Sequence, residues 1–242
     1  MPRKLSTKKR KAESSSSPTP PVRMKLSLST SLDVNHRLTR NFFSQPTVDL
    51  AKKLLGCLIV HNISNDQTVA CKIVETEGYP GGCDKASHSA GGRRTERTAA
   101  MFMQPGTIYV YIIYGKLHCC NISALEDGGA VLIRAVEPVY GLETMRNLRA
   151  AQGVKLTNGP AKFCSAMNIT KNCDQLDSVT HKNFYLLASS DDINEGMIVT
   201  SKRVGIDGYG EEAANQPWRF YLLNNKYVSI RDKQQEKLAA KS

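Results

Sequence analysis

The sequence predicts an α+β domain built around a mostly antiparallel sheet. Three observations support this fold class: β-rich runs dominate the chain from residue 36 onward, many of them follow one another directly, and helical patterns are few. Consecutive strands joined by short turns pair antiparallel, whereas a doubly wound fold alternates strands with helices. The 242 residues suffice for one such domain with a hydrophobic core and a tail.

We expect the chain to begin and end in disordered segments, residues 1–34 and 235–242, around a single domain at 35–234. The first segment is rich in Lys, Ser, Thr and Pro, and it has too little apolar content to offset the entropy lost on ordering. Its basic run K-K-R-K at 8–11 resembles a nuclear import signal and predicts a protein of the nucleus. The alternative is a solvated basic tail that binds nucleic acid weakly.

The first helix of the domain is expected over residues 45–55, where apolar side chains recur at helical spacing. Pro46 suits the first turn of this helix, and Gly56 follows as a stop. Two β-rich runs, at 57–63 and 68–75, then flank three polar residues, a pattern typical of a hairpin.

The middle of the chain predicts three more strands, at 107–114, 117–123 and 130–136. The first is nearly all β-branched or aromatic, as expected of a strand that is covered on both faces. Gly115-Lys116 turns this strand into the second. These three strands extend the same antiparallel sheet.

Two short helices follow, at 141–150 and 160–166. The first has an acidic residue early and arginines late, which matches the helix dipole, and the second begins at an N-G-P turn. Strands at 184–188 and 197–204 and a hairpin over 219–230 complete the domain. Helices are therefore expected to flank the sheet at few places.

The charge of the chain favours a polyanionic partner. The sequence has 33 Lys+Arg against 22 Asp+Glu, a formal net charge of +11 and a pI of about 9.4. Nucleic acid is the first such partner to consider, and an anionic membrane surface the second. Residues 1–25 alone carry +7, so the rest of the chain is only mildly basic and its charge does not establish DNA binding.

Composition also bears on the cellular compartment and on cofactors. No apolar run reaches 18 residues, so we expect no membrane span, and no apolar stretch follows the basic N-terminus as in a secretory signal. The seven cysteines form no C-x-x-C pair and mostly have apolar neighbours. We therefore expect reduced, buried thiols rather than disulfides or a zinc site, with no metal and no cofactor.

The first candidate for chemistry is a pair of carboxylates at the end of a strand. Glu75 and Glu77 are two residues apart and therefore project from the same face, directly before a G-Y-P break. A carboxylate at a strand end beside a loop is well placed to act as a general base. The alternative is a solvated strand face or a salt bridge, and the segment alone favours that alternative.

A long polar loop follows at 84–95. It holds His88, which could hydrogen-bond a base, a phosphate or a carboxylate, although a lone loop histidine is more often simply solvated. Arg93 and Arg94, after a glycine pair, suit contact with phosphates.

Aromatic and polar residues on the central strands are the third candidate group. Strand alternation places Tyr109 and Tyr111 on one face and Tyr114 on the other, near the turn. Core packing is one interpretation, above all for Tyr109; base stacking at the rim of the sheet is the other. Asn121 and Arg134 are polar residues within apolar runs, and buried polar groups need partners or a function.

Taken together, these segments resemble the alkyladenine (3-methyladenine) DNA glycosylases. The resemblance runs in order over residues 38–232, and it rests on the motifs V-E-T-E-G-Y, D-K-A-S-H-S, M-F-M-Q-P-G-T-I-Y-V-Y-I-I-Y-G, C-N-I-S, L-I-R-A-V-E-P and N-G-P-A-K. It implies one domain with a curved antiparallel sheet. It also implies a monomeric enzyme that acts on double-stranded DNA containing damaged purines and needs no metal or cofactor.

The resemblance assigns a role to each matching position in the reaction. Glu77 corresponds to the general base that activates water, Arg134 to the second group that holds the water, and the backbone carbonyl of Val204 to a third contact. Tyr79 and His88 correspond to walls of the base pocket.

Four further positions are assigned contacts with the base or the DNA. Tyr111 corresponds to the stacking partner on the opposite face of the base, and Asn121 to the residue that discriminates against guanine. Tyr114 corresponds to the side chain inserted into the duplex, and Lys162 to a phosphate contact.

The reaction implied is removal of alkylated and deaminated purines by base flipping and water attack. No lysine matches a Schiff-base nucleophile, so we expect no lyase activity. Gly78 stands where Ala is usual in the family, and Ala161 and Phe163 depart from the usual N-G-P segment. Two alternatives remain: a non-catalytic protein that shields lesions, and a hydrolase or formyl transferase acting on a small nucleotide.

Overall fold

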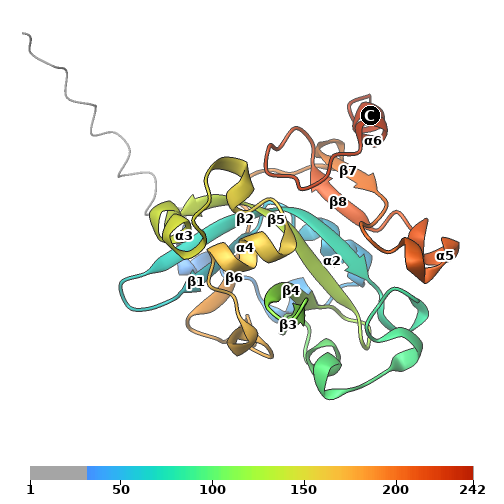
Figure 1. Ribbon diagram of the computed structural model, residues 1–242, viewed down its shortest axis with the longest axis horizontal. Coiled ribbons are helices and arrows are strands. Elements are labelled where there is room, and N and C mark those ends of the chain that lie inside the picture. Colours follow the sequence, from blue (N-terminus) through green and yellow to red (C-terminus); the bar gives the residue numbers. More distant parts are fainter. Residues whose placement is uncertain (1–31, 242) are drawn as a thin grey trace, which may run out of the picture.

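The computed structural model describes residues 32–241, so the basic N-terminal run and its candidate import signal lie outside the described residues. The described chain folds around a curled eight-stranded sheet with the order β3-β4-β5-β2-β1-β6, to which β8 and β7 are added beside β2 (Figure 1). The strands are β1 (Leu58–Asn62), β2 (Thr68–Tyr79), β3 (Ile108–Ile113), β4 (Leu117–Ser123), β5 (Ala130–Tyr140), β6 (Phe184–Leu187), β7 (Ile198–Ser201) and β8 (Arg219–Leu222).

The α-helices are few and short, as the sequence predicts. They are α1 (Arg40–Phe43), α2 (Thr47–Lys53), α3 (Leu142–Arg149), α4 (Pro160–Ala166), α5 (Glu211–Ala214) and α6 (Lys233–Ala239). The strand pairs named within this sheet are antiparallel, so the predicted α+β class with a curved antiparallel sheet is confirmed. No helix between residues 32 and 241 is both long and apolar enough to cross a membrane.

Strand β2 organises the sheet because it has neighbours on both sides along its length. Its first half pairs with β1, and its last residues pair with β8, while β5 runs along its other edge. Glu75 and Glu77 therefore lie in the middle of the sheet rather than at an edge, and both side chains are fully buried. The interpretation of this segment as a solvated strand face is wrong, whereas the other interpretation, a salt bridge, is confirmed, because Glu75 pairs with Arg219 and Glu77 with Arg134.

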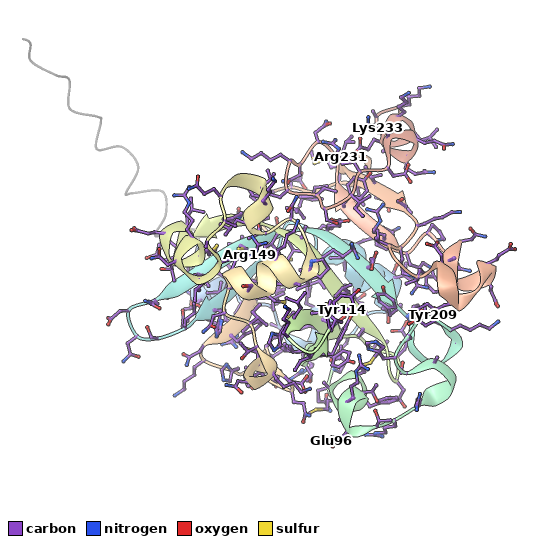
Figure 2. All side chains as sticks on the ribbon, viewed as in Figure 1. Glu96, Tyr114, Arg149, Tyr209, Arg231 and Lys233 are labelled. Atoms are coloured by element: carbon purple, nitrogen blue, oxygen red, sulfur yellow. The ribbon has the colours of Figure 1, made fainter. Side chains whose placement is uncertain are left out.

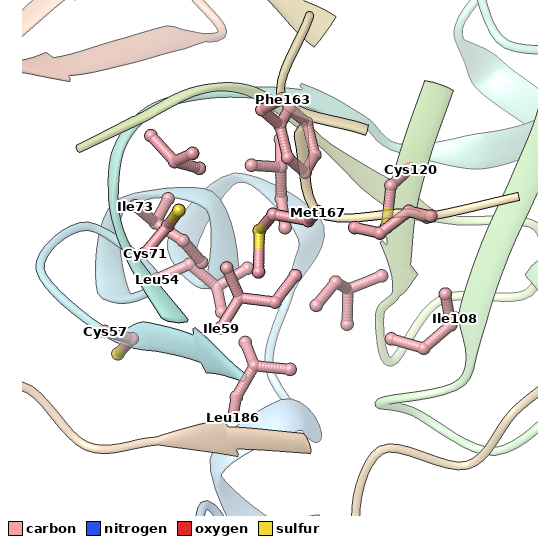
Figure 3. Close-up of a cluster of buried hydrophobic side chains, with 14 of the residues drawn as sticks. Leu54, Cys57, Ile59, Cys71, Ile73, Ile108, Cys120, Phe163, Met167 and Leu186 are labelled. Carbon is pink, nitrogen blue, oxygen red and sulfur yellow. The ribbon is translucent and has the colours of Figure 1, made fainter. Parts of the chain in front are cut away.

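The main core lies between the sheet and the helices α2 and α4 (Figure 3). Leu54, directly after α2, meets Ile59 and Ile73 of the sheet there. Phe163 of α4 and Met167, directly after α4, join them, and all five side chains are fully buried. Burying a side chain of this size contributes about 1.5–3 kcal/mol, so these contacts fix how both helices sit on the sheet. Phe163, which departs from the family pattern, is thus a core residue.

The predicted chain ends differ from the structure. Residues 232–239 are ordered: Asp232 caps α6 by accepting the backbone N–H of Gln235, and Tyr221 bonds Glu236. The expected disorder from residue 235 is wrong because a capping acid precedes good helix formers and the helix has a strand to pack on. At the other end Leu32 already packs on the sheet.

Two strand predictions also need correction. The hairpin expected over 219–230 has only its first strand, β8, which pairs with β7 and β2 instead of folding back on itself. Strand β3 is covered on both faces only over its first half, where the consecutive residues Ile108, Tyr109 and Val110 are buried, whereas Ile112 near its end is 43% exposed. Its apolar residues continue beyond the core toward the turn at Tyr114. All seven cysteines are free thiols, as expected, with Cys83 exposed.

Candidate active site

Glu77 is a buried carboxylate held by three donors. Its Oε2 accepts the Tyr79 hydroxyl at 2.9 Å and Arg134 Nη1 at 3.2 Å, and its Oε1 accepts the backbone N–H of Val204 at 2.7 Å. Burial, followed by the Glu77 carboxylate, raises the pKa of Tyr79 well above its ordinary value, so that hydroxyl remains a donor. The amide of Val204 thus binds Glu77, and the contact of its carbonyl with the attacking water, which the resemblance implies, stays a prediction.

Arg134 reaches both buried carboxylates because strand β5 bulges at this residue. Thr76 pairs with Ile133 and Glu75 pairs with Ala135, which leaves Arg134 as the extra residue of β5. A bulge of this kind redirects a side chain, and bulges are frequent beside active sites. Burial opposes the charged form of Arg134, but Glu77 and Glu75 outweigh it and hold the pKa of Arg134 above its ordinary value.

A cavity of about 390 Å³ opens directly beside this carboxylate. Of the residues singled out from the sequence, eight line it: Tyr79, His88, Tyr109, Tyr111, Tyr114, Asn121, Arg134 and Val204. Glu77 lies behind Tyr79, Arg134 and Val204, the three residues that bond it. The structure thus brings together residues from β2, the following loop, β3, β4, β5 and the segment after β7.

Aromatic rings form one side of the cavity. His88 packs edge-on against Tyr111 with ring centroids 4.6 Å apart, and its Nδ1 lies 2.8 Å from the Tyr109 hydroxyl. Tyr109 and Tyr111 share a face, as strand alternation predicts, with centroids 5.5 Å apart. Burial, assisted by the nearby Arg97, lowers the pKa of His88 to about 4, so the imidazole is neutral at neutral pH.

Tyr79 is fixed from outside the cavity by a buried arginine. The Arg203 guanidinium lies 4.5 Å from the Tyr79 ring centre and 4.9 Å from that of Trp218. Asp84, at the start of the polar loop, pairs with Arg203, and both side chains are inaccessible to solvent. This ion pair ties the loop that carries His88 to the wall formed by Tyr79.

Tyr114 is highly exposed, in contrast to the buried residues of the cavity wall. It occupies the turn between β3 and β4, is 87% exposed and reaches the rim of the cavity, where Tyr209 also lies (Figure 2). Asn121 sits deeper, and its Nδ2 donates to the carbonyl of Tyr109 at 3.0 Å, which fixes the orientation of the amide.

The three residues expected at phosphates lie outside this cavity. Arg93 and Arg94 are exposed; Arg93 lines a neighbouring surface cavity, and Arg94 stacks on the ring of Phe102 at 5.1 Å. Lys162 is held in the first turn of α4 by Asn158 Oδ1 at 2.8 Å. Arg93 and Arg94 are therefore open to a large ligand, whereas Lys162 is half-buried.

The structure adds cavity residues that the sequence did not single out. Arg97 lies over the Tyr111 ring at 5.4 Å and 3.5 Å from His88 Nε2, and Tyr209 covers another part of the rim. Tyr109, expected mainly as a core residue, is both buried and part of the cavity wall. Arg97 and Tyr209 lie in short 3-10 helices, Glu96–Phe102 and Asp207–Tyr209, which are too short to show an apolar periodicity, so no sequence pattern marked them.

Comparison with known proteins shows the family of the chain. A family model of methylpurine-DNA glycosylase matches residues 41–226. The chain is 44% identical over 204 residues to a putative 3-methyladenine DNA glycosylase of Clostridium perfringens, covering 80% of this chain and 98% of that protein. It is 43% identical over 207 residues to the human DNA-3-methyladenine glycosylase, covering 81% and 69%. The chain therefore belongs to the methylpurine-DNA glycosylase family.

Proposed function

We propose that this protein is a monomeric, monofunctional glycosylase that removes alkylated and deaminated purines from double-stranded DNA and so starts base excision repair. The proposed substrates are 3-methyladenine, 7-methylguanine, hypoxanthine and ethenoadenine. The observation that carries the proposal is a buried carboxylate, Glu77, placed directly behind a cavity that is lined by aromatic rings.

The substrate must leave the duplex before it can enter this cavity. Extrusion of a base costs a few kcal/mol, least for damaged or mispaired bases. Tyr114, exposed at the end of the β3–β4 hairpin, would fill the gap and keep the base from returning. Arg93, Arg94 and Lys162 would bind phosphates and position the duplex.

Within the cavity, Tyr79, His88 and Tyr111 would stack on the extruded purine. Stacking contributes about 1–3 kcal/mol per base and tolerates varied shapes, which suits a broad set of lesions. A neutral His88 adds no positive charge next to an alkylated purine that is itself cationic. Asn121, held by the Tyr109 carbonyl, would discriminate against guanine.

Glu77 would then accept a proton from water as the water attacks the glycosidic carbon. A water molecule must reach Oε2, where the Tyr79 hydroxyl now donates, and Arg134 would hold the same water. The C–N bond breaks, the base departs with its electron pair, and the water oxygen bonds to the sugar. General-base catalysis of this kind contributes about 10²–10⁴-fold.

Two finer points belong to the same proposal. No lysine is proposed as a Schiff-base nucleophile, so borohydride should trap no covalent complex between protein and DNA. Residues 1–31 are proposed to direct the protein to the nucleus; a fluorescent protein fused to them should accumulate there, and replacement of the K-K-R-K run by alanines should abolish this.

The competing function is lesion shielding without cleavage. A protein that only binds lesions needs the aromatic walls of the cavity and Tyr114 as a wedge that enters the duplex. It has no need for a buried carboxylate bonded to Arg134. Keeping such a charge buried is costly, which favours a catalytic use.

The test is excision from a duplex oligonucleotide that carries one hypoxanthine, with hot alkali to cut abasic sites. Wild type should produce cleavable sites, and Glu77→Gln should bind the lesion but reduce single-turnover excision by at least about 100-fold. Glu137→Gln is the matched control, because this carboxylate on β5 bonds Asn225 and does not line the cavity. Lesion binding without excision by wild type would instead establish shielding.

A further inference from the structure

Glu75 is a fully buried carboxylate for which the proposed reaction has no use. Its Oε1 accepts Arg219 Nη1 at 2.9 Å, and its Oε2 accepts the backbone N–H of Ser229 at 2.6 Å. The same Oε1 lies 3.5 Å from Arg134 Nε. Glu75 therefore contacts the arginine that binds Glu77, but from the side away from Glu77.

Three ion pairs join four charges in a row, from Glu77 through Arg134 and Glu75 to Arg219, and we call this row the four-charge cluster. The two carboxylates have no exposed surface, and the two arginine side chains are at most 9% exposed. Buried charges are tolerated when they balance, and here two negative charges meet two positive ones. Arg219 is held in turn by the carbonyls of Lys202 and Ile230.

Arg134 depends on Glu75 for part of its orientation. Its Nη1 donates to Glu77, its Nη2 lies 3.5 Å from Ser229 Oγ, and its Nε is buried without a hydrogen-bond partner. The carboxylate of Glu75 is the charged group that faces this Nε. Without Glu75, the guanidinium loses the contact that keeps it from turning away from Glu77.

We propose that Glu75 is a positioning residue which, together with Arg219, holds Arg134 in place and balances the charge beside Glu77. This inference rests on the proposed function of Glu77 as the base. Removal of the Glu75 charge leaves the cluster with a net charge of +1, which favours the carboxylate form of Glu77. Removal of the Arg219 charge leaves −1, which favours the protonated form.

The other titratable and charged groups around Glu77 do not balance its charge in the way that Arg134, Glu75 and Arg219 do. Burial keeps the pKa values of Tyr79, Tyr111 and Cys119 above their ordinary values, so these groups stay neutral at neutral pH. Arg203 is already paired with Asp84 behind Tyr79. The other groups facing Glu77 across the cavity are neutral His88, with a pKa of about 4, and the exposed Arg97.

The test compares pH profiles of single-turnover excision for Glu75→Gln, Arg219→Gln and the double variant. The substrate is a duplex that carries one 7-methylguanine, because the fixed positive charge of this lesion removes the need for a general acid. The acid limb of the profile, where the rate falls at low pH, then reports on the general base. Residues two apart on a strand are separated by about 7 Å, at which one unit charge shifts a titration by about one pH unit.

Glu75→Gln should move the acid limb to lower pH by about one unit and reduce the plateau rate about tenfold. Arg219→Gln should move the limb to higher pH, and the double variant should bring it back toward wild type. A purely structural role would lower stability and rate without shifts of opposite sign. Should Glu75→Gln not fold, the upward shift in Arg219→Gln still tests the proposal.

Asp177→Asn is the matched control, since this carboxylate pairs with Arg40 and does not line the cavity. It should leave the acid limb where it is in wild type. If Glu75→Gln and Arg219→Gln fold and retain excision but their acid limbs stay at the wild-type pH, the proposed role of Glu75 is overturned. Absence of excision by wild type would instead overturn the proposed function, so the two failures are distinct.

Discussion

Tyr114 occupies a backbone conformation that its side chain disfavours. Its φ is 50°, in the left-handed region, and the next residue, Gly115, has φ of 70°. A non-glycine residue there costs on the order of 1 kcal/mol, and Asn or Gly would be preferred in a turn selected for stability alone. A large, exposed aromatic ring at this position therefore fits a functional requirement such as insertion into DNA.

We expect Tyr114→Asn to separate stability from function. The free energy of unfolding should stay equal or rise by up to about 1 kcal/mol, because Asn tolerates the left-handed region. Excision from duplex DNA should fall about tenfold or more, since nothing fills the gap left by the base. Excision from single-stranded DNA should change much less. Denaturant unfolding and single-turnover excision measure the two effects.

Gln175→Asn is the control for this prediction. Gln175 is also a non-glycine residue with positive φ, 65°, and it does not line the cavity. It should show the same stability gain with unchanged excision. An equal loss of excision by Tyr114→Asn on single-stranded and duplex substrates would contradict the wedge role.

At the scale of single residues, the sequence located much of the cavity but not its outer support. The motifs brought forward Glu77 and Arg134, which the structure places in contact. Arg97 and the ion pair of Asp84 with Arg203 went unnoticed, because a charged side chain outside the strands and longer helices looks the same in sequence whether it is solvated or buried. The roles of all these residues remain predictions.

Among the helices and strands, α2 is capped at its N-terminus by a residue that is distant in the sequence. Pro46 offers no side-chain cap, and Glu126, in the β4–β5 loop, accepts the backbone N–H of Thr47 at 2.9 Å and its hydroxyl at 2.7 Å. A carboxylate at this end also suits the helix dipole. The loop and the helix that covers the core are thereby linked.

Glu126→Ala should therefore lower the free energy of unfolding by about 1–2 kcal/mol, as loss of a helix cap does. Thermal or denaturant unfolding measures the change. Glu143→Ala, which removes an exposed acid from the first turn of α3, should cost less than about 0.5 kcal/mol. Equal losses of unfolding free energy in the two variants would show that the contact between Glu126 and Thr47 does not stabilise α2 more than an exposed acid does.

Strands and helices with local signals were predictable, and features that depend on neighbours were not. Helix α2 lies within its predicted range, and Gly56, with φ of +82°, follows it where the sequence placed a stop. The bulge at Arg134 has no local signal, since it arises from pairing with β2. The missing second strand after β8 has the same cause, because β7 and β2 already occupy both edges of β8.

On the scale of the whole molecule, the fold gathers a reaction centre from segments far apart in the chain. The cavity uses β2 through β5 and the segment after β7, and it lies beside a carboxylate that the branched sheet buries completely. Of the formal net charge of +11, residues 1–25 carry +7, so the rest of the chain is only mildly basic.

The most direct test of the account follows the base and the bond cleavage separately. Ethenoadenine is fluorescent, and its emission changes when it leaves the stacked duplex. Stopped-flow fluorescence under single-turnover conditions, combined with chemical quench for released base, is applied to wild type and Glu77→Gln. We predict the same early fluorescence change in both proteins and base release by wild type alone. Base release by Glu77→Gln at the wild-type rate, or release that no fluorescence change precedes, would contradict the account.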